Sequence, residues 1–148
     1  MDAIDRKILN LIQTAFPVEA EPYRWIGEQV GVTGGEAFDR VRRLRESGMI
    51  RRIGAVFDPK ILGFVSTLCA AQVSDEKLED FVGQVNRYPG VTHNYRRNHA
   101  YNVWFTVIAA GEAELNSFLN EIRENTGITD LISLRAVRTF KINARFDF

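Results

Sequence analysis

Residues 33–50 read TGGEAFDRVRRLRESGMI, and this stretch decides the fold of the N-terminal part of the chain. Thr33 and Glu36 have the spacing of a capping box, which predicts that a helix begins here. Gly48 is expected to end that helix. Apolar residues recur at helical spacing between the two ends, and they predict one buried face formed by Ala37, Val41 and Leu44.

Two shorter helices are expected before this one, over residues 2–16 and 22–30, with Pro17 and Gly31 at their ends. Three short helices joined by tight turns predict a helix-turn-helix arrangement. Residues 50–57 alternate and are rich in β-formers, so we expect a short β-ribbon, or wing, to follow the third helix.

Beyond residue 63 the pattern changes to alternating strands and helices. Strands are expected over residues 64–73, 91–96, 101–109 and 131–142. Helices are expected over residues 74–87 and 112–125. This βαββαβ order predicts a ferredoxin-like domain. The predicted fold class is therefore α+β, with a winged helix-turn-helix domain over residues 1–62 and a ferredoxin-like ligand-binding or catalytic domain over residues 63–148.

The composition excludes several classes of protein. The chain has 148 residues, and 19 Lys and Arg residues balance 19 Asp and Glu residues, so no global field attracts nucleic acid or an anionic membrane. Cys69 is the one cysteine, which excludes an internal disulfide, and we expect it to be a small core residue. The charged N-terminus lacks a signal-peptide core, and no apolar stretch reaches the ~20 residues of a membrane helix, so we expect a cytoplasmic protein.

A cationic and aromatic cluster lies on the expected hairpin between residues 91 and 109. No Asp or Glu occurs from residue 81 to residue 111, a stretch that contains both histidines of the chain. Arginine pairs with oxyanions through a planar fork, aromatic rings cover a flat π-face, and imidazole ligates iron or moves a proton near neutral pH. Taken singly, each residue is more typical of a solvated sheet face, but together they predict a site for a flat anionic ligand. The candidate residues are His93, Asn94, Tyr95, Arg96, Arg97, His99, Tyr101, Asn102 and Trp104.

A second basic cluster occupies residues 36–52, where six arginines face three acids. A basic third helix and wing are typical of a DNA-binding protein. However, Gly34 and Gly35 offer no side chain to a base edge at the start of the helix, and Glu36 would repel phosphate. Pairing of these arginines with neighbouring carboxylates fits the sequence at least as well as DNA contact.

The chain resembles the Lrp/AsnC family, which joins a winged helix-turn-helix to a βαββαβ effector domain. The resemblance lies in DRKIL at residues 5–9, RVRRLRESGMI at 40–50 and DPKILG at 58–63. Asn102 stands where amino-acid-responsive members have the Asp of a Gly-x-x-Asp motif. One function that this resemblance implies is a DNA-binding transcriptional regulator with a small-molecule or haem effector.

Three further stretches closely resemble siroheme decarboxylase subunits: IRRIGAVF at 50–57, PGVT at 89–92 and HNYRRNHAYNVWF at 93–105. This resemblance implies removal of carbon dioxide from two acetate side chains of siroheme, giving 12,18-didecarboxysiroheme for haem or haem d1 biosynthesis. It implies no cofactor beyond the iron tetrapyrrole substrate. It also implies a related second subunit, usually in a heterodimer, although a homodimer would also fit. Binding to DNA or to a membrane is not expected.

We expect the cationic residues to hold those carboxylates of the substrate that do not react. Arg96 and Arg97 would act with Arg51 or Arg52, because a reacting carboxylate bound tightly by arginine would be stabilised in the ground state. The remaining expected substrate-binding residues are Asn94, Tyr101, Asn102 and Trp104.

The two histidines are expected to divide the chemistry between them. One ligates the iron, and the other delivers a proton to the carbon that has lost carbon dioxide. We assign His93 as the general acid and His99 as the iron ligand, and the reverse assignment, with His93 on the iron, stays open. Tyr95 is the alternative proton donor.

Overall fold

The computed structural model describes residues 1–142 and 145–148. The chain forms two compact units, one from residues 1–56 with the C-terminal residues from 141 onward, the other from residues 57–140. The sequence predicted a boundary between residues 62 and 63 and a C-terminus within the second domain. The C-terminal residues belong to the first unit because side chains of its first helix bond their backbone: the Gln13 amide pairs with Phe146 and the Asn10 amide with Phe148.

Three helices form the N-terminal unit: α1 (Ala3–Ile12), α2 (Pro22–Val30) and α3 (Gly34–Glu46). Helix α1 ends four residues before the predicted position. At the start of α3, the Thr33 hydroxyl accepts a hydrogen bond from the Glu36 N–H at 3.2 Å. The Glu36 carboxylate bonds Arg40 and not the backbone N–H of Thr33. Of the two hydrogen bonds of the predicted capping box, the structure therefore contains the one accepted by the Thr33 hydroxyl. The three helices enclose a core formed by Ile8, Leu9, Ile26, Ala37, Val41, Leu44 and Ile50.

The predicted wing over residues 50–57 is wrong, because these residues form no strand. A β-strand needs a neighbour to receive its backbone hydrogen bonds, and this segment pairs with no strand of the described chain. Ile50 packs into the helical core, but the later β-forming residues of the segment remain at the surface, with Val56 82% and Phe57 72% exposed.

The second unit confirms the predicted βαββαβ order. Its elements are β1 (Val65–Ala71), the short 3₁₀ turn η1 (Asp75–Lys77), α4 (Leu78–Arg87), β2 (Val91–Arg96), β3 (Val103–Ala109), α5 (Glu112–Thr126) and β4 (Leu131–Leu134). The strands lie in the order β2-β3-β1-β4, and each neighbouring pair is antiparallel. The last strand is shorter than the predicted 131–142, because β1 pairs only with residues 131–134.

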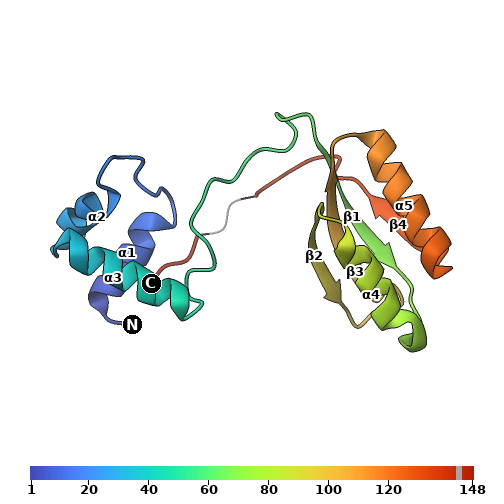
Figure 1. Ribbon diagram of the computed structural model, residues 1–148, viewed down its shortest axis with the longest axis horizontal. Coiled ribbons are helices and arrows are strands. Elements are labelled where there is room, and N and C mark those ends of the chain that lie inside the picture. Colours follow the sequence, from blue (N-terminus) through green and yellow to red (C-terminus); the bar gives the residue numbers. More distant parts are fainter. Residues whose placement is uncertain (143–144) are drawn as a thin grey trace. The chain divides into compact units, whose positions relative to one another are not determined.

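Helices α4 and α5 cover one face of this sheet and leave the other face without a helix (Figure 1). The core between sheet and helices includes Phe81, Val85, Phe105, Leu115, Phe118 and Ile122. Because side chains alternate along a strand, the residues between the core positions lie on the uncovered face. Among these, Leu68 and Leu134 are 40% and 45% exposed.

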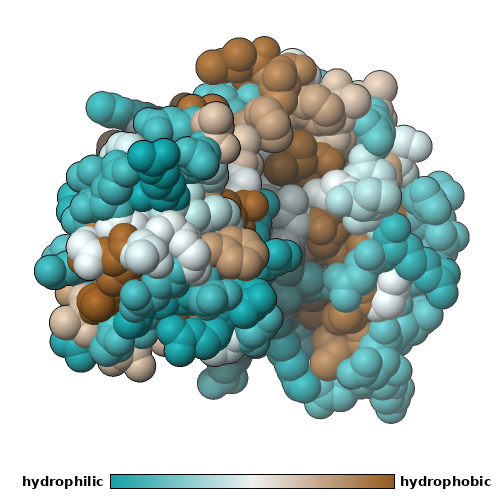
Figure 2. Space-filling view, turned by 60° about the vertical axis from the view of Figure 1, so that its left-hand side comes forward, coloured by the Kyte–Doolittle hydropathy of each residue, from teal (hydrophilic) through white to brown (hydrophobic). Residues whose placement is uncertain are grey.

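Apolar side chains also reach the surface elsewhere in the molecule (Figure 2). In the segment that leads into β1, Ile61 is 84% and Leu62 56% exposed. Across the described residues, the helices are all too short or too polar to span a membrane.

Candidate functional site

The hairpin of β2 and β3 brings the predicted cationic and aromatic residues together. Its loop closes where the Arg97 N–H donates to the Asn102 carbonyl at 2.8 Å. Beside this loop lies a pocket of about 380 Å³, lined by Arg96, Arg97, Asn98, His99 and Asn102. The hairpin and its loop therefore form the candidate site.

The alternation of strand β2 separates its side chains between the two faces of the sheet. His93 and Tyr95 lie on one face, with their rings stacked at a centroid distance of 6.1 Å. Asn94 lies on the other face, where its Nδ2 donates to the Asn86 Oδ1 of helix α4 at 3.0 Å. Asn94 therefore faces the helices, away from the two predicted catalytic side chains.

Arg97 lies over two aromatic rings of the hairpin. Its guanidinium carbon is 5.8 Å from the centre of the Tyr95 ring and 6.0 Å from that of Trp104. Tyr95 and Trp104 are neighbours across the two strands, and the Trp104 Nε1–H donates to the Tyr101 carbonyl at 2.7 Å. Within the described residues Arg97 has no carboxylate partner, so its N–H groups can receive an anion.

Two carboxylates that sequence reasoning missed lie against the hairpin. Asp75 accepts from Arg96 at 2.7 Å, and Asp130 accepts from the Tyr101 hydroxyl at 2.7 Å. This second bond raises the pKa of Tyr101. The stretch without Asp or Glu in the sequence therefore has two carboxylates beside it in the folded chain. The predicted topology contained the signal, because antiparallel pairing puts the end of β1 and the start of β4 beside the hairpin loop.

The hydrogen bonds of the two histidines differ at Nδ1. The His99 Nδ1 accepts the Tyr101 N–H at 3.1 Å, so the proton of the neutral ring lies on Nε2. The His93 Nδ1 lies 3.0 Å from the Thr92 hydroxyl. When Nδ1 carries the proton, it can donate a hydrogen bond to this hydroxyl, and Nε2 then has a free lone pair. The neutral His99 ring can therefore donate a proton outward, whereas His93 can present a metal-ligating nitrogen.

Asn102 is engaged at both ends of its amide. Its Oδ1 accepts the Val73 N–H at 2.9 Å, and its Nδ2 donates to the Val73 carbonyl at 2.7 Å. Asn102 was predicted to bind substrate directly. The structure instead commits this amide to the backbone that follows β1.

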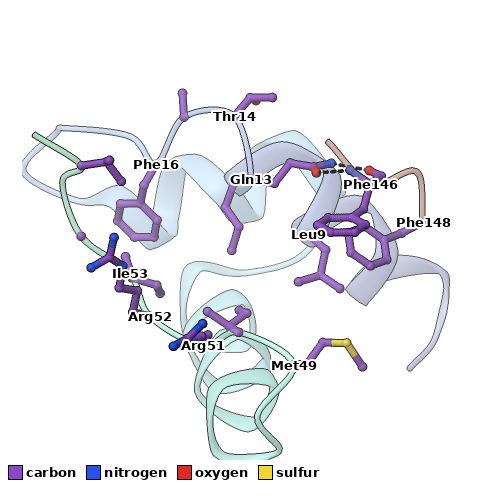
Figure 3. Close-up of a pocket in the computed structure, with 15 residues that line it drawn as sticks. Leu9, Gln13, Thr14, Phe16, Met49, Arg51, Arg52, Ile53, Phe146 and Phe148 are labelled. Atoms are coloured by element: carbon purple, nitrogen blue, oxygen red, sulfur yellow. Dashed lines mark hydrogen bonds between the residues drawn. The ribbon is translucent and has the colours of Figure 1, made fainter. Parts of the chain in front are cut away.

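Arg51 and Arg52 lie in the N-terminal unit and line a different pocket, of about 660 Å³ (Figure 3). Most of its lining is apolar, and it includes Leu9, Phe16, Met49 and Ile53. Two hydrogen bonds between Gln13 and Phe146 hold the C-terminal segment at its rim, as Figure 3 shows. The two arginines therefore belong to another unit than the hairpin residues with which they were grouped.

Two of the four arginines of helix α3, Arg40 and Arg42, are paired with carboxylates, as the alternative to DNA contact predicted, whereas Arg43 and Arg45 form no ion pair within the described residues. Arg40 is only 12% exposed, and it bonds Asp2 at 2.7 Å and Asp5 at 2.8 Å. The Asp5 backbone N–H and the Arg40 guanidinium lower the pKa of Asp2 to about 2. On the outer side of the helix, Arg42 bonds Asp39 at 2.8 Å.

The remaining candidates for chemistry are few. No cluster of three or more His, Cys, Asp or Glu residues suited to a metal ion occurs in the part of the chain that the structure describes. Cys69 is fully buried in the core, as predicted, and burial raises the pKa of its thiol to about 11.

Comparison with known proteins finds a matching family for each part of the chain. Residues 5–51 match the siroheme decarboxylase NirDL-like helix-turn-helix domain. Residues 61–141 match the AsnC-like ligand binding domain.

The similar full-length proteins point in the same direction. The siroheme decarboxylase alpha subunit of Nitratidesulfovibrio vulgaris is 51% identical over 146 residues, which cover 99% of this chain and 82% of that protein. A crystal structure of the siroheme decarboxylase NirDL matches with a TM-score of 0.76 at 35% identity, and covers 98% of this chain but 47% of that one. The structure of NirDL in complex with an iron-uroporphyrin III analogue matches with a TM-score of 0.74 at 34% identity, over 95% of this chain and 48% of that one.

Proposed function

Because this chain belongs to the siroheme decarboxylase family, we propose that it is a subunit of a carboxy-lyase that removes carbon dioxide from two acetate side chains of siroheme. The product would be 12,18-didecarboxysiroheme. The observation that carries the proposal is the hairpin itself. It bears the Arg97 guanidinium, which has no carboxylate partner among the described residues, two stacked aromatic–imidazole pairs, and a pocket beside its loop that Arg97 and His99 line. These groups complement a flat ring with an iron centre and many carboxylates.

The arginines of the hairpin bind and orient the ring. Arg97 offers a planar donor set held over two aromatic rings, so it pairs with a carboxylate at the ring edge. Arg96 exchanges Asp75 for a second substrate carboxylate, because that surface pair is exposed and weak. Arg51 and Arg52 belong to the N-terminal unit, and their contact with substrate carboxylates stays a prediction from the sequence.

The reaction breaks the bond between the acetate methylene carbon and its carboxyl carbon. Carbon dioxide leaves, and the electron pair stays on the methylene carbon, where the conjugated ring spreads it until a proton arrives. The chain has three tasks: to fix the ring, to keep the leaving carboxylate away from arginine and water, and to supply the proton.

The hydrogen bonds of the two imidazoles support the reverse of the assignment that the sequence favoured. His99 accepts at Nδ1 and carries its proton on Nε2, so we assign His99 as the proton donor. The Nε2 proton passes to the methylene carbon, and Nδ1 takes up a proton from solvent so that the ring stays neutral. The His93 Nδ1–H can donate a hydrogen bond to the Thr92 hydroxyl, which leaves the Nε2 lone pair for the iron. Tyr95 remains the alternative donor, because it stacks on His93 and is 52% exposed.

A second subunit completes the enzyme in this proposal. The chain spans about half the length of the solved NirDL chain, and its relative in N. vulgaris is named an alpha subunit. Exposed apolar residues before β1, and the face of the sheet without helices, are surfaces that a related chain would cover. A heterodimer is our first choice and a homodimer the alternative.

Turnover of siroheme tests the proposal directly. The purified chain, together with its second subunit, is incubated anaerobically with siroheme, and the product is followed by mass spectrometry. Loss of two carbon dioxide units is expected. Siroheme recovered with its mass unchanged would refute the enzymatic function.

The alternative function, a DNA-binding regulator, is tested by a gel shift with duplex DNA. Counterion release would give that regulator a steep dependence on salt. Because Arg40 and Arg42 are held by carboxylates, and Gly34 and Gly35 offer no side chain to a base edge at the start of α3, we expect no specific shift. A specific shift that responds to siroheme would support the regulator instead.

A further inference from the structure

We propose that Asn102 is a positioning residue, which holds the loop bearing Arg97 and His99 by pairing with both backbone groups of Val73. This inference rests on the proposed function for its catalytic consequence. Its structural part, the control of the loop by one amide, can be tested without turnover.

The two hydrogen bonds tie together segments far apart in the sequence. Val73 is 3% exposed and follows the central strand β1, whereas Asn102 ends the hairpin loop. The side chain of Asn102 bonds Val73 at 2.9 and 2.7 Å, while its own carbonyl receives the Arg97 N–H at 2.8 Å. One residue thus joins the loop to the centre of the sheet.

Two other tethers of the loop are weaker. The Arg96–Asp75 pair and the Tyr101–Asp130 bond are exposed to solvent, so water competes for them. Both Asn102 side-chain bonds are partly buried, which strengthens them and makes their loss costly. Asn102 therefore holds the loop that bears His99 to the sheet through two bonds that water does not easily replace.

The pairing requires an amide and not a carboxylate. Asparagine offers one acceptor to the Val73 N–H and one donor to the Val73 carbonyl. An ionised aspartate has the same shape but no donor, so one of its oxygens would face the Val73 carbonyl and repel it. Protonation would restore the donor, which makes Asn102→Asp a variant that acid should repair.

The experiment compares three full-length proteins: the parent, Asn102→Asp and the control Asn116→Asp. Asn116 is exposed on α5, so its replacement adds the same charge without removing the hydrogen bonds that the Asn102 amide makes to Val73. Each protein, with its second subunit, is loaded with iron-uroporphyrin for absorption spectra and with siroheme for turnover. Near pH ~7.5 we expect Asn102→Asp to lose about tenfold to a hundredfold in turnover and to show a changed spectrum, since a shift of ~1 Å in a catalytic group has that effect. The control should match the parent.

The pH dependence separates positioning from simple loss of structure. As pH falls from ~7.5 to ~5, the turnover and spectrum of Asn102→Asp should approach those of the parent, because the carboxyl regains its donor. The titratable groups around this position are Arg96, Arg97, His99, Asp75 and Asp130, and all five are present in the parent, which therefore serves as the reference at every pH.

Several outcomes would overturn the inference. One is an Asn102→Asp protein with parental spectrum and turnover near neutral pH. Another is a loss that stays constant down to pH ~5, and a third is a fall in melting temperature with no spectral change. If the parent binds iron-uroporphyrin but leaves siroheme intact, the proposed function fails, while the spectral comparison still decides the role of Asn102.

Discussion

Helix α3 and the β2–β3 hairpin both carry clustered arginines, yet one arginine in each region, Arg40 and Arg97, has very different surroundings. In α3, Arg40 lies among three carboxylates and is 12% exposed. In the hairpin, Arg97 lies on aromatic rings and has no carboxylate partner among the described residues. A count of charges along the sequence makes both regions equal candidates for binding an anion. Pairing in space shows that carboxylates already neutralise Arg40 of α3, whereas Arg97 of the hairpin is available to an anionic ligand.

The strongest effect is expected from substitution of the two histidines, because both lie in the hairpin and the proposed reaction depends on them. We expect His99→Ala to lose about 10²–10⁴-fold in turnover, because a general acid contributes that much. The absorption spectrum of bound iron-uroporphyrin should stay close to that of the parent. His93→Ala should change the spectrum. The opposite pattern would restore the assignment that the sequence favoured.

Arginine substitutions test the comparison itself. Arg97→Ala should weaken binding of iron-uroporphyrin by about 10- to 100-fold, since a hydrogen bond to a charged group contributes ~1.5–3 kcal/mol. Arg42→Ala is the matched control, because Arg42 is already bonded to Asp39 and should leave the affinity unchanged. Titration followed by absorbance measures both. An equal loss of affinity in Arg97→Ala and Arg42→Ala would show that the hairpin arginine has no special role in binding.

Removal of the buried arginine should affect stability instead of binding. Arg40→Met leaves three carboxylates without their shared cation, and we expect the melting temperature of the N-terminal unit to fall by about 5 °C. Hydrogen exchange in α1 and α3 reports on that unit separately. A fall in iron-uroporphyrin affinity, with the melting temperature unchanged, would contradict this prediction.

The same ion cluster predicts a loss of stability in acid. The folded pKa of Asp2, about 2, lies below its ordinary value of 3.8. This carboxylate therefore stabilises the fold above pH 3.8, and the contribution is lost as the pH falls toward about 2. Melting curves over this range should show a smaller acid dependence in Arg40→Met than in the parent, since Arg40 is the second cause of the lowered pKa.

The weakest effect is expected from Asp75, the carboxylate of the η1 turn that pairs with Arg96 of the hairpin. Asp75→Asn frees Arg96 from an exposed pair worth about 0–1 kcal/mol, so affinity for iron-uroporphyrin should rise about two- to threefold. Glu112→Gln, at the pair with Arg135 on the other end of the unit, is the control. An unchanged affinity in Asp75→Asn would mean that Arg96 does not contact the ligand.

Local patterns predicted much of the fold. The capping residues, the apolar spacing and the turn glycines correctly indicated α2, α3 and α5, and alternation correctly indicated β2. The prediction was wrong where a strand needs a partner. Residues 50–57 and 135–142 have strand-like composition, but neither segment meets a neighbouring strand in the described chain.

The candidate site was predictable as a region but not as a set of contacts. The hairpin and its cationic and aromatic character followed from the sequence between residues 91 and 109. The sequence does not reveal that Asp75 reaches Arg96, or that Val73 engages the amide of Asn102. Each of these contacts joins residues more than twenty positions apart.

The order of helices and strands, the family and the place of the cationic hairpin could all be inferred from the amino-acid sequence, because each depends on residues close together in the chain. Only the tertiary structure decided which arginines are neutralised, which ring nitrogen of His99 carries the proton and what Asn102 holds. Those properties depend on partners brought together by the pairing of strands and the packing of helices, and local sequence carries no direct record of them.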